Sequence, residues 1–545
     1  MSSNLAGSRE ATVPTRVDAV IVGAGFSGLY MLHKLRETGL NAVVLEAGDG
    51  VGGTWYWNRY PGARVDVEGF DYSYSFSADL QEWEWSERYP AQPELLRYLD
   101  HVADRFGLRR DIRLSTRVTS AHYDEAATLW TVCTERGQAY RATWCVMATG
   151  CLSSAQLPAI DGIGDFAGEW FHTAHWPVGG VDFTGKRVAV IGTGSSGIQS
   201  IPIIAEQAAR LTVFQRTAAF AIPARNRDLE PGELDELKAH YPELRDRARH
   251  GIVGMSRIAE GSTSALDATA DQRQQVFEEI WAAGTLSGLT TSYRDVMTDR
   301  TVNDQVADFV RGKIREIVDD PDTAERLCPR GYPFGAKRPC LHTGYYATYN
   351  RDNVRLVDVS ENPIERLSAR GVVVGGTEHE VDAIVFATGF DAMTGSLAAI
   401  DIRGRSGRTL RDKWSAGPIT YLGLQSAGFP NLFLVAGPGS PSVLTNMVMS
   451  IEQHVEWIAD CIGYARERGV VAVEATERAE RDWVHHVNDV SNALLYSEAS
   501  TWYLGANVPG KPRVFMPYAG GLGAYRKRCD AVAAAGYDGF VLTAG

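Results

Sequence analysis

The chain has 545 residues, which at roughly 150 residues per domain corresponds to about three to four domains and excludes a single ordinary core. Its 54 Lys and Arg against 67 Asp and Glu give a net charge of −13, spread along the chain, which argues against nucleic acid or an anionic membrane as a partner. Hydrophobic residues make up 44% and charged residues 22%, so the chain is not disordered and can bury large cores.

Residues 1–16 mix Ser, Thr, Pro, Arg and Glu without the apolar stretch of a secretion signal, and we expect a flexible tail there. No uninterrupted apolar run approaches the ~18 to 20 residues that cross a bilayer, so the sequence predicts no membrane span and a cytoplasmic protein. The seven cysteines are odd in number and include no Cys-x-x-Cys pair. They suggest neither a disulfide framework nor a zinc site, and we expect no metal.

The first ordered elements form a strand, a glycine turn and a helix. The stretch V-D-A-V-I-V from Val17 is continuously apolar, which is typical of a buried parallel strand, and it runs into G-A-G-F-S-G. Leu29, Leu32 and Leu35 then recur at near-helical spacing, and N-A-V-V-L-E, ending at Glu46, is a second buried strand. The segment therefore predicts a βαβ unit.

The glycines of this first turn indicate a dinucleotide site. Gly23, Gly25 and Gly28 permit the tight turn, the approach of a pyrophosphate to backbone N–H groups and close packing of helix on strand. Glu46 closes the second strand 23 residues after Gly23, where a carboxylate can accept hydrogen bonds from a ribose diol. A lone glycine triplet could be an ordinary turn, but strand, helix and acid together favour FAD or NAD.

A second unit of the same kind begins at Lys186. The stretch R-V-A-V-I-G-T-G-S-S-G contains Gly192, Gly194 and Gly197, and a helix and the strand L-T-V-F-Q follow. The position that corresponds to Glu46 is Gln215, followed by Arg216 and Thr217. A guanidinium binds a ribose 2′-phosphate that a carboxylate would repel, so this unit predicts NADPH. The alternative is that Arg216 is a solvated surface charge.

Two further features of the sequence indicate how the chain divides into domains. C-V-M-A-T-G and I-V-F-A-T-G end two further strands, at Gly150 and Gly389, and we interpret these points as crossings between domains. Residues 225–327 have the amphipathic pattern of helices. We therefore expect a flexible tail at 1–16, an FAD-binding domain at 17–150 and 390–545, an NADP-binding domain at 151–224 and 328–389, and a helical insertion at 225–327.

Two nucleotide units in one chain imply that electrons pass from NADPH to a flavin, which includes both reductases and monooxygenases. Two longer signatures distinguish them. Residues 52–66 read G-G-T-W-Y-W-N-R-Y-P-G-A-R-V-D, and residues 166–177 contain F-x-G-x-x-x-H-x-x-x-W-P, through Phe166, Gly168, His172, Trp176 and Pro177. These motifs closely resemble those of the type I Baeyer–Villiger monooxygenases, and the likeness extends from about residue 17 to the C-terminus.

This resemblance implies an α/β fold with two Rossmann-like domains, for FAD and NADP, and a helical insertion. In the family, NADPH reduces FAD, O2 adds at the flavin C4a position, and the resulting peroxide attacks a ketone to give an ester or lactone. A deprotonated peroxide needs a permanent cation beside it, shielded from water. The resemblance assigns this catalytic role to Arg338, gives Asp66 the task of orienting that arginine, and places Lys337 with Arg216 at the NADPH phosphate.

The motifs and the resemblance together predict the contacts of each cofactor. Those of FAD are Gly23, Gly25, Ser27, Gly28, Glu46, Gly53, Thr54, Trp55, Asp66, Tyr72, Val118 and Met447. Those of NADP are Gly192, Thr193, Gly194, Ser195, Ser196, Gly197, Gln199, Arg216, Thr217, Lys337, Arg338 and Trp502. By family likeness Trp502 folds over the nicotinamide, although an ordinary packed loop tryptophan is the alternative.

The resemblance places the ketone pocket at Pro441, Ser442, Val443 and Leu444, although these residues could equally belong to the core. We expect His172 to fix the linker between the nucleotide domains rather than to act as a base, because O2 and reduced flavin supply the nucleophile. The expected partners are O2 and a small apolar ketone, whether aryl, cyclic or steroidal, without an obligate protein partner.

Two other functions stay open. A flavin-containing monooxygenase of sulfur or nitrogen shares both glycine motifs, but the Lys337–Arg338 pair and the second signature argue against it as the main activity. A redox-sensing protein that only binds both nucleotides would have no need of Asp66 and Arg338.

Overall fold

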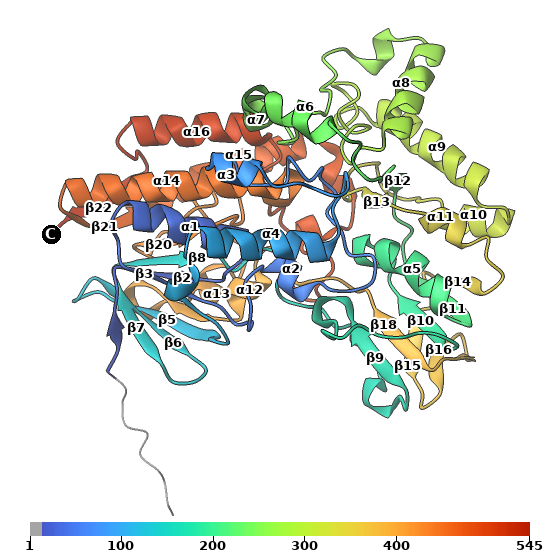
Figure 1. Ribbon diagram of the computed structural model, residues 1–545, viewed down its shortest axis with the longest axis horizontal. Coiled ribbons are helices and arrows are strands. Elements are labelled where there is room, and N and C mark those ends of the chain that lie inside the picture. Colours follow the sequence, from blue (N-terminus) through green and yellow to red (C-terminus); the bar gives the residue numbers. More distant parts are fainter. Residues whose placement is uncertain (1–12) are drawn as a thin grey trace, which may run out of the picture.

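The computed structural model describes residues 13–545 and contains two five-stranded parallel sheets (Figure 1). The first sheet has the spatial order β20 (Leu432–Leu434), β8 (Trp144–Met147), β2 (Ala19–Val22), β3 (Ala42–Leu45) and β4 (Ile112–Arg113). The second has the order β14 (Val354–Asp358), β11 (Arg210–Gln215), β10 (Arg187–Ile191), β18 (Ala383–Phe386) and β9 (Glu169–His172). Both sheets confirm the predicted α/β fold with two Rossmann-like units.

Each sheet is built around one of the predicted βαβ units. Helix α1 (Phe26–Glu37) connects β2 to β3, and α5 (Ser195–Gln207) connects β10 to β11; both strand pairs are parallel. All four residues of β2 and all four of β3 are buried, as the continuous apolar runs predict. Helix α14 (Met447–Glu467) packs against α1.

Two further sheets that we did not predict are built on antiparallel strand pairs, although the two edge strands of the first one pair in parallel. The first group is β1 (Thr15–Arg16), β7 (Ala139–Ala142), β6 (Leu129–Thr134), β5 (Val118–Asp124) and β19 (Asp401–Arg403), in this spatial order. The second is β15 (Ile364–Leu367), β16 (Gly371–Val374) and β17 (Thr377–Glu380). Because β1 pairs with β7, the tail expected at 1–16 ends before Thr15; residues 1–12 lie outside the described part.

Residues 225–327 contain helices, which lie at the upper right of Figure 1. They are α6 (Glu233–Ala239), α7 (Tyr241–His250), α8 (Ala270–Ala283), α9 (Arg300–Ile317) and α10 (Pro321–Leu327). Arg245 of α7 is 3% exposed and donates hydrogen bonds to the carbonyl oxygens of Phe70 (2.5 Å) and Ser73 (3.1 Å). A buried guanidinium therefore attaches the helical segment to the N-terminal part of the chain.

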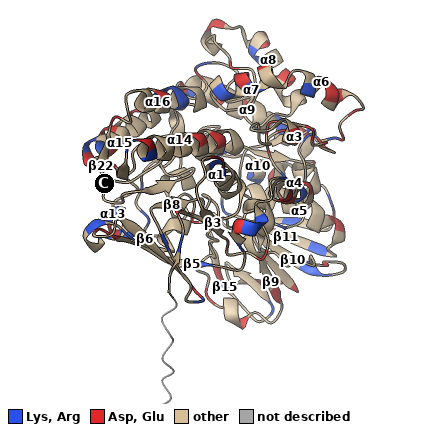
Figure 2. Ribbon diagram, turned by 60° about the vertical axis from the view of Figure 1, so that its left-hand side comes forward, with Lys and Arg blue, Asp and Glu red and all other residues tan. Residues whose placement is uncertain are grey.

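The remaining elements are short connections and a C-terminal layer. They are α2 (Thr54–Trp57), α3 (Ala78–Gln81), α4 (Gln92–Arg105), β12 (Ala221–Pro223), β13 (Cys340–His342), α11 (Tyr345–Thr348), α12 (Gly395–Ala398), α13 (Leu410–Lys413), β21 (Val470–Ala475), α15 (Glu477–Asn492), α16 (Leu522–Ala534) and β22 (Phe540–Ala544). No helix within residues 13–545 has the length and apolar character needed to cross a membrane. In the view of Figure 2, acidic and basic residues are interspersed.

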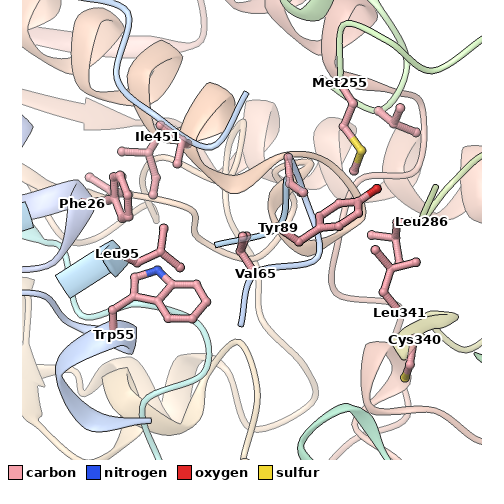
Figure 3. Close-up of a cluster of buried hydrophobic side chains, with 14 of the residues drawn as sticks. Phe26, Trp55, Val65, Tyr89, Leu95, Met255, Leu286, Cys340, Leu341 and Ile451 are labelled. Carbon is pink, nitrogen blue, oxygen red and sulfur yellow. The ribbon is translucent and has the colours of Figure 1, made fainter. Parts of the chain in front are cut away.

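One large apolar core extends from the first sheet through α14 to the helical segment. Figure 3 shows part of it, including Phe26 of α1, Trp55 of α2 and Leu341 of β13. Val65 belongs to the same core and is 4% exposed. The 52–66 segment is thus anchored by apolar side chains immediately before Asp66.

Candidate active site

The first glycine turn leaves the start of α1 open. Gly23 has φ +106°, and a Cβ atom there would lie 2.6 Å from the carbonyl oxygen of Ala148, so no other residue fits. Helix α1 begins after Gly25 without a side-chain cap. Its first N–H groups are therefore available to a phosphate, as the predicted FAD site requires.

Glu46 directly follows β3, next to this turn, and is 5% exposed. Its Oε2 accepts a hydrogen bond from the Ala24 N–H and its Oε1 one from the Gly48 N–H, both at 2.7 Å. Burial raises the pKa of Glu46, and these two N–H groups act in the opposite direction. Since a carboxylate oxygen has two lone-pair sites, each keeps one for a ribose hydroxyl.

The 52–66 segment faces the same turn. A Cβ atom at Gly25 would lie 3.2 Å from the Cα atom of Gly53. The rings of Trp55 and Tyr72 meet edge to face at 5.9 Å. This packing places the 52–66 segment beside the uncapped start of α1, where the predicted FAD site lies.

The other predicted FAD contacts lie at four different elements. Ser27 is buried in α1, Thr54 is exposed at the start of α2, Val118 is buried at the start of β5, and Met447 is the first residue of α14.

The second glycine turn repeats the geometry of the first. Gly192 has φ +108°, and a Cβ atom there would lie 2.5 Å from the carbonyl oxygen of Ala387. Helix α5 begins after Gly194, again without a side-chain cap, and a Cβ atom at Gly194 would meet nothing within 4 Å. This open helix start fits the pyrophosphate of NADP. Ala148 and Ala387 each begin one of the two A-T-G tripeptides, so each tripeptide packs against one glycine turn.

The basic residues predicted for the 2′-phosphate come together. Arg216 and Thr217 are exposed at the end of β11, and Thr193 Oγ1 donates to the Thr217 carbonyl oxygen at 3.2 Å. Burial lowers the pKa of Lys337, and the neighbouring Arg216 guanidinium lowers it further. Two neighbouring positive charges of this kind fit an anionic ligand between them.

Arg338 and Asp66 form a bidentate ion pair. Arg338 Nε lies 3.0 Å from Asp66 Oδ2, and Nη2 lies 3.0 Å from Oδ1 and 2.9 Å from Oδ2. Arg338 Nη1 donates to the Val443 carbonyl oxygen at 2.6 Å. Burial lowers the pKa of Arg338, but the Asp66 carboxylate more than offsets this, so the pKa lies above its ordinary value.

The loop expected to form the ketone pocket therefore lies against this ion pair. Pro441, Ser442 and Val443 are buried and Leu444 is partly exposed; residues Ser442–Leu444 form a 3-10 helix. Ser442 Oγ lies 3.9 Å from the sulfur of Met447 and 3.9 Å from that of Met393. The wall beside Arg338 is thus largely apolar.

The loop with Trp502 packs close to Arg338. Trp502 is partly exposed, and its ring centroid lies 4.4 Å from that of Tyr503. Burial raises the pKa of the Tyr503 hydroxyl, and the nearby positive charge of Arg338 lowers it in part. Lys511 Nζ lies 2.5 Å from Asp391 Oδ1 and donates to the Ala392 carbonyl oxygen at 2.7 Å. These contacts hold the loop over the site.

The second signature contains β9, the edge strand of the second sheet. Phe166 is buried in the core of the second sheet, and Gly168 approaches the Asp382 carbonyl oxygen so closely that its Cβ atom would lie 2.4 Å away. Trp176 is buried and Pro177 exposed. His172 Nδ1 accepts from the Ala174 N–H at 3.0 Å, and burial lowers its pKa to about 4.

Ser195 and Ser196 lie at the first turn of α5. Ser195 Oγ is 3.2 Å from the sulfur of Cys340, and Ser196 Oγ accepts from Thr173 Oγ1 at 3.3 Å. Gly197 lies in the same turn.

Three residues that bear on the site escaped the sequence analysis or took on a different role. Tyr503 was overlooked beside Trp502, although the position next to a predicted lid residue was a usable signal. Tyr60 lies in the 52–66 segment and donates to Gln199 Oε1 at 2.8 Å. Gln199, expected at NADP, also donates from Nε2 to the Arg64 carbonyl oxygen at 3.0 Å.

A cavity of about 620 Å³ opens away from these residues. It lies between α8, α9 and the turn that begins at His342, and no predicted site residue lines it. It therefore contributes nothing to the site described above.

The chain is similar to several monooxygenases over nearly its whole length. A family model described as pyridine nucleotide-disulphide oxidoreductase matches residues 20–285. The acetone monooxygenase (methyl acetate-forming) of Gordonia sp. (strain TY-5) is 44% identical, covering 97% of this chain and 99% of that protein. A Baeyer–Villiger monooxygenase of Pseudooceanicola batsensis is 42% identical, covering 99% and 98%.

Two further similarities bear on the alternatives. The phenazine N-monooxygenase PhzNO1 of Lysobacter antibioticus is 43% identical and covers 97% of each chain. Among solved structures, an oxidized steroid monooxygenase bound to NADP superposes with a TM-score of 0.93 at 52% identity, covering 97% of this chain and 100% of that one.

Proposed function

The chain belongs to the Baeyer–Villiger monooxygenases, and on this premise we propose which residues carry the reaction and what class of ketone it takes. The enzyme uses FAD, NADPH and O2 to insert one oxygen atom beside a ketone carbonyl, giving an ester or lactone. When bound, reduced FAD supplies the oxygen nucleophile together with O2. The protein has to hold the ketone, stabilise developing negative charge and exclude water.

We assign the charge stabilisation to Arg338, and the observation that carries this assignment is its bidentate pair with Asp66 beside Val443. A guanidinium keeps its proton at any working pH, so its charge is permanent. Asp66 fixes the guanidinium plane by two parallel hydrogen bonds, which leaves little reorganisation for the moment when a substrate oxygen becomes negative. Asp66 is therefore the orienting residue.

Cofactor binding follows the two glycine turns. In our proposal the start of α1 and Glu46 hold the pyrophosphate and ribose of FAD, while the start of α5 holds the pyrophosphate of NADP. Arg216 and Lys337 bind the 2′-phosphate. This assigns FAD to residues 17–150 and 390–545, and NADP to residues 151–224 and 328–389, with 225–327 as a helical insertion.

The loop from Trp502 to Lys511 excludes water in this scheme. Its support is the pinning of Lys511 by Asp391 and the burial of Tyr503 near Arg338. A water-poor site strengthens the interaction between Arg338 and a developing oxyanion, because the local dielectric constant is lower.

The substrate we propose is an apolar ketone. The buried residues Pro441 and Val443 and the Met447 side chain give the wall beside Arg338 no charge that would attract an ionic substrate. The similarity to enzymes named for acetone and for steroids leaves the size of the ketone open. We keep the location of the enzyme in the cytoplasm, and the absence of a nucleic-acid or obligate protein partner, as predictions.

Oxygen transfer to nitrogen is a second candidate, because the phenazine N-monooxygenase is 43% identical. The permanent cation at Arg338 favours a deprotonated nucleophile and thus a ketone, whereas attack by nitrogen or sulfur needs a protonated, electrophilic oxygen donor.

The test is to supply the holoenzyme with NADPH, ¹⁸O₂ and a panel of phenylacetone, cyclohexanone, progesterone and phenazine, and to analyse the products by mass spectrometry. Esters or lactones with one labelled oxygen would support the proposal and rank the ketone classes. A labelled N-oxide as the main product would favour the second candidate. NADPH oxidation that yields only hydrogen peroxide with every compound would contradict the proposed ketone class.

A further inference from the structure

Gln199 lies one turn inside α5, the helix whose start forms the second glycine turn, and its side chain reaches the 52–66 segment. Its Nε2 donates to the Arg64 carbonyl oxygen at 3.0 Å, and its Oε1 accepts from Tyr60 Oη at 2.8 Å. Both ends of the amide are therefore engaged by one short stretch of chain, residues 60–64, that belongs to the other nucleotide unit.

The fit between this stretch and α5 is tight. Gly62 has φ +80°, and a Cβ atom there would lie 2.3 Å from the Gln199 carbonyl oxygen. The backbone of residues 60–64 thus lies directly on the helix, where no side chain at position 62 could be accommodated. Arg64 is also held on its other side, since its Nη1 lies 2.7 Å from Glu87 Oε2.

Asp66 follows this stretch after one buried residue. Val65 is 4% exposed, and its N–H donates to the Pro90 carbonyl oxygen at 3.2 Å. The chain from the Arg64 carbonyl group to the Asp66 carboxylate is therefore short and packed. A shift of the Arg64 carbonyl oxygen would move the carboxylate that orients Arg338.

We propose that Gln199 is a positioning residue, which fixes residues 60–66 on α5 and so couples the place of the NADP-binding helix to the geometry of Asp66 and Arg338. This inference rests on the roles proposed above for Asp66 and Arg338. It differs from the expectation that Gln199 contacts NADP, because Oε1 and one Nε2 hydrogen already have protein partners.

Two variants and one control separate these readings. Gln199→Leu removes both hydrogen bonds at similar side-chain size, and Gln199→Glu keeps the acceptor for Tyr60 but not the donor for Arg64. Gln207→Leu is the matched control, because Gln207 lies in the same helix and accepts only from the Phe183 N–H, at 3.3 Å. The FAD-loaded holoenzyme is used throughout, and Gln199→Glu replaces Gln199→Leu if the latter does not retain FAD.

The first readout is amide hydrogen exchange in peptides covering residues 60–66. Loss of both bonds should speed exchange there about ten-fold, with a smaller increase in Gln199→Glu and none in the control. The second is the ketone reaction: kcat for ester formation should fall about ten-fold and the share of NADPH lost to hydrogen peroxide should rise, while KM for the ketone stays within about two-fold.

The third readout, the dissociation constant of NADP⁺, decides between the two readings. Weaker NADP⁺ binding in Gln199→Leu with unchanged exchange in residues 60–66 would overturn the inference and make Gln199 a direct ligand. If the Arg338→Ala enzyme still forms ester, the proposed function of Arg338 is wrong. Faster exchange in Gln199→Leu would then show only that Gln199 holds residues 60–66, and the coupling to catalysis would be refuted. Unchanged exchange with ester formation still dependent on Arg338 would refute the positioning role alone.

Discussion

Lys337 and Arg338 are adjacent in the chain, yet their side chains have opposite electrostatic surroundings. The Lys337 ammonium lies near the Arg216 guanidinium, which lowers its pKa further than burial alone, whereas Arg338 is paired with Asp66. In our proposal one dipeptide thus serves two sites: a cationic pocket for a phosphate and a fixed guanidinium beside the apolar wall at Val443. The nucleotide phosphate and the reacting ketone would then contact neighbouring residues.

The first prediction concerns Arg338→Lys. A lysine keeps the charge but cannot make the two parallel hydrogen bonds to Asp66, so the cation is no longer held in place. We expect NADPH oxidation to persist within a few-fold and ester formation to fall about a hundred-fold, the size of effect seen when one preorganised donor is removed. Parallel assays of NADPH loss and of ester by mass spectrometry measure both. Ester formation at the wild-type rate would refute the assignment.

The second prediction concerns coenzyme choice. Arg216→Ala removes a charge-assisted contact to the 2′-phosphate, so KM for NADPH should rise roughly ten- to a hundred-fold, while that for NADH should change little. Lys337→Ala should act in the same direction. Steady-state rates with both coenzymes are the measurement. If the two coenzymes lose affinity equally, the basic residues do not recognise the phosphate.

The βαβ units were predictable because each is local. Within about 25 residues each unit contains a continuous apolar run such as Ala19–Val22 and glycines whose position leaves no room for a side chain. The same stretch ends with a carboxylate or an arginine at the next strand end. The Asp66–Arg338 contact is of another kind, since 272 residues separate its members. No local pattern encodes it, and the expectation came only from the family resemblance.

The parts that were not predicted have physical reasons as well. Strands β5 and β6 span only six or seven positions, and their buried residues alternate irregularly with more accessible ones, which is a weak signal inside a long chain. The direction of the Gln199 side chain depends on how two distant units dock, which one sequence does not reveal. The role of Tyr503 depends on a Gly/Pro-rich loop whose conformation is fixed by tertiary contacts such as Lys511 with Asp391.

The third prediction tests the pinning of this loop. Lys511→Met keeps the length of the side chain but removes the ion pair with Asp391, in which the lysine side chain is 11% exposed. Without this ion pair Asp391 has lost its cation and the loop is no longer held in place. Binding of NADP⁺ must then also order the loop, which costs free energy, and we expect NADP⁺ to bind about ten-fold more weakly. The dissociation constant of NADP⁺ is the measurement.

Hydrogen exchange in residues 501–512 should rise in the same variant. Arg513→Gln provides the control, since Arg513 lies in the same loop and contacts only the hydroxyl of Ser500, at 3.2 Å. If both variants bind NADP⁺ equally, the ion pair does not hold the loop in its binding position.

The last prediction concerns pH and His172. Its Nδ1 accepts from the Ala174 N–H, and its Nε2 lies 3.3 Å from Thr388 Oγ1, which donates to the Gln156 carbonyl oxygen at 2.6 Å. The ring must therefore carry its single proton on Nε2, because a proton on Nδ1 would face the Ala174 N–H. This arrangement agrees with the direction in which burial moves the pKa, from 6.5 to about 4.

A histidine whose folded pKa is depressed binds protons more tightly in the unfolded chain, so stability falls as pH drops from about 6.5 towards 4. We expect His172 to account for about 2 kcal/mol of that loss, less than the full shift implies because the site is partly screened. In His172→Gln the unfolding midpoint of the holoenzyme should therefore vary less between these pH values than in the wild type. His485→Gln, at an exposed position on α15, is the control. If both variants follow the wild-type curve, protonation of His172 is not coupled to folding.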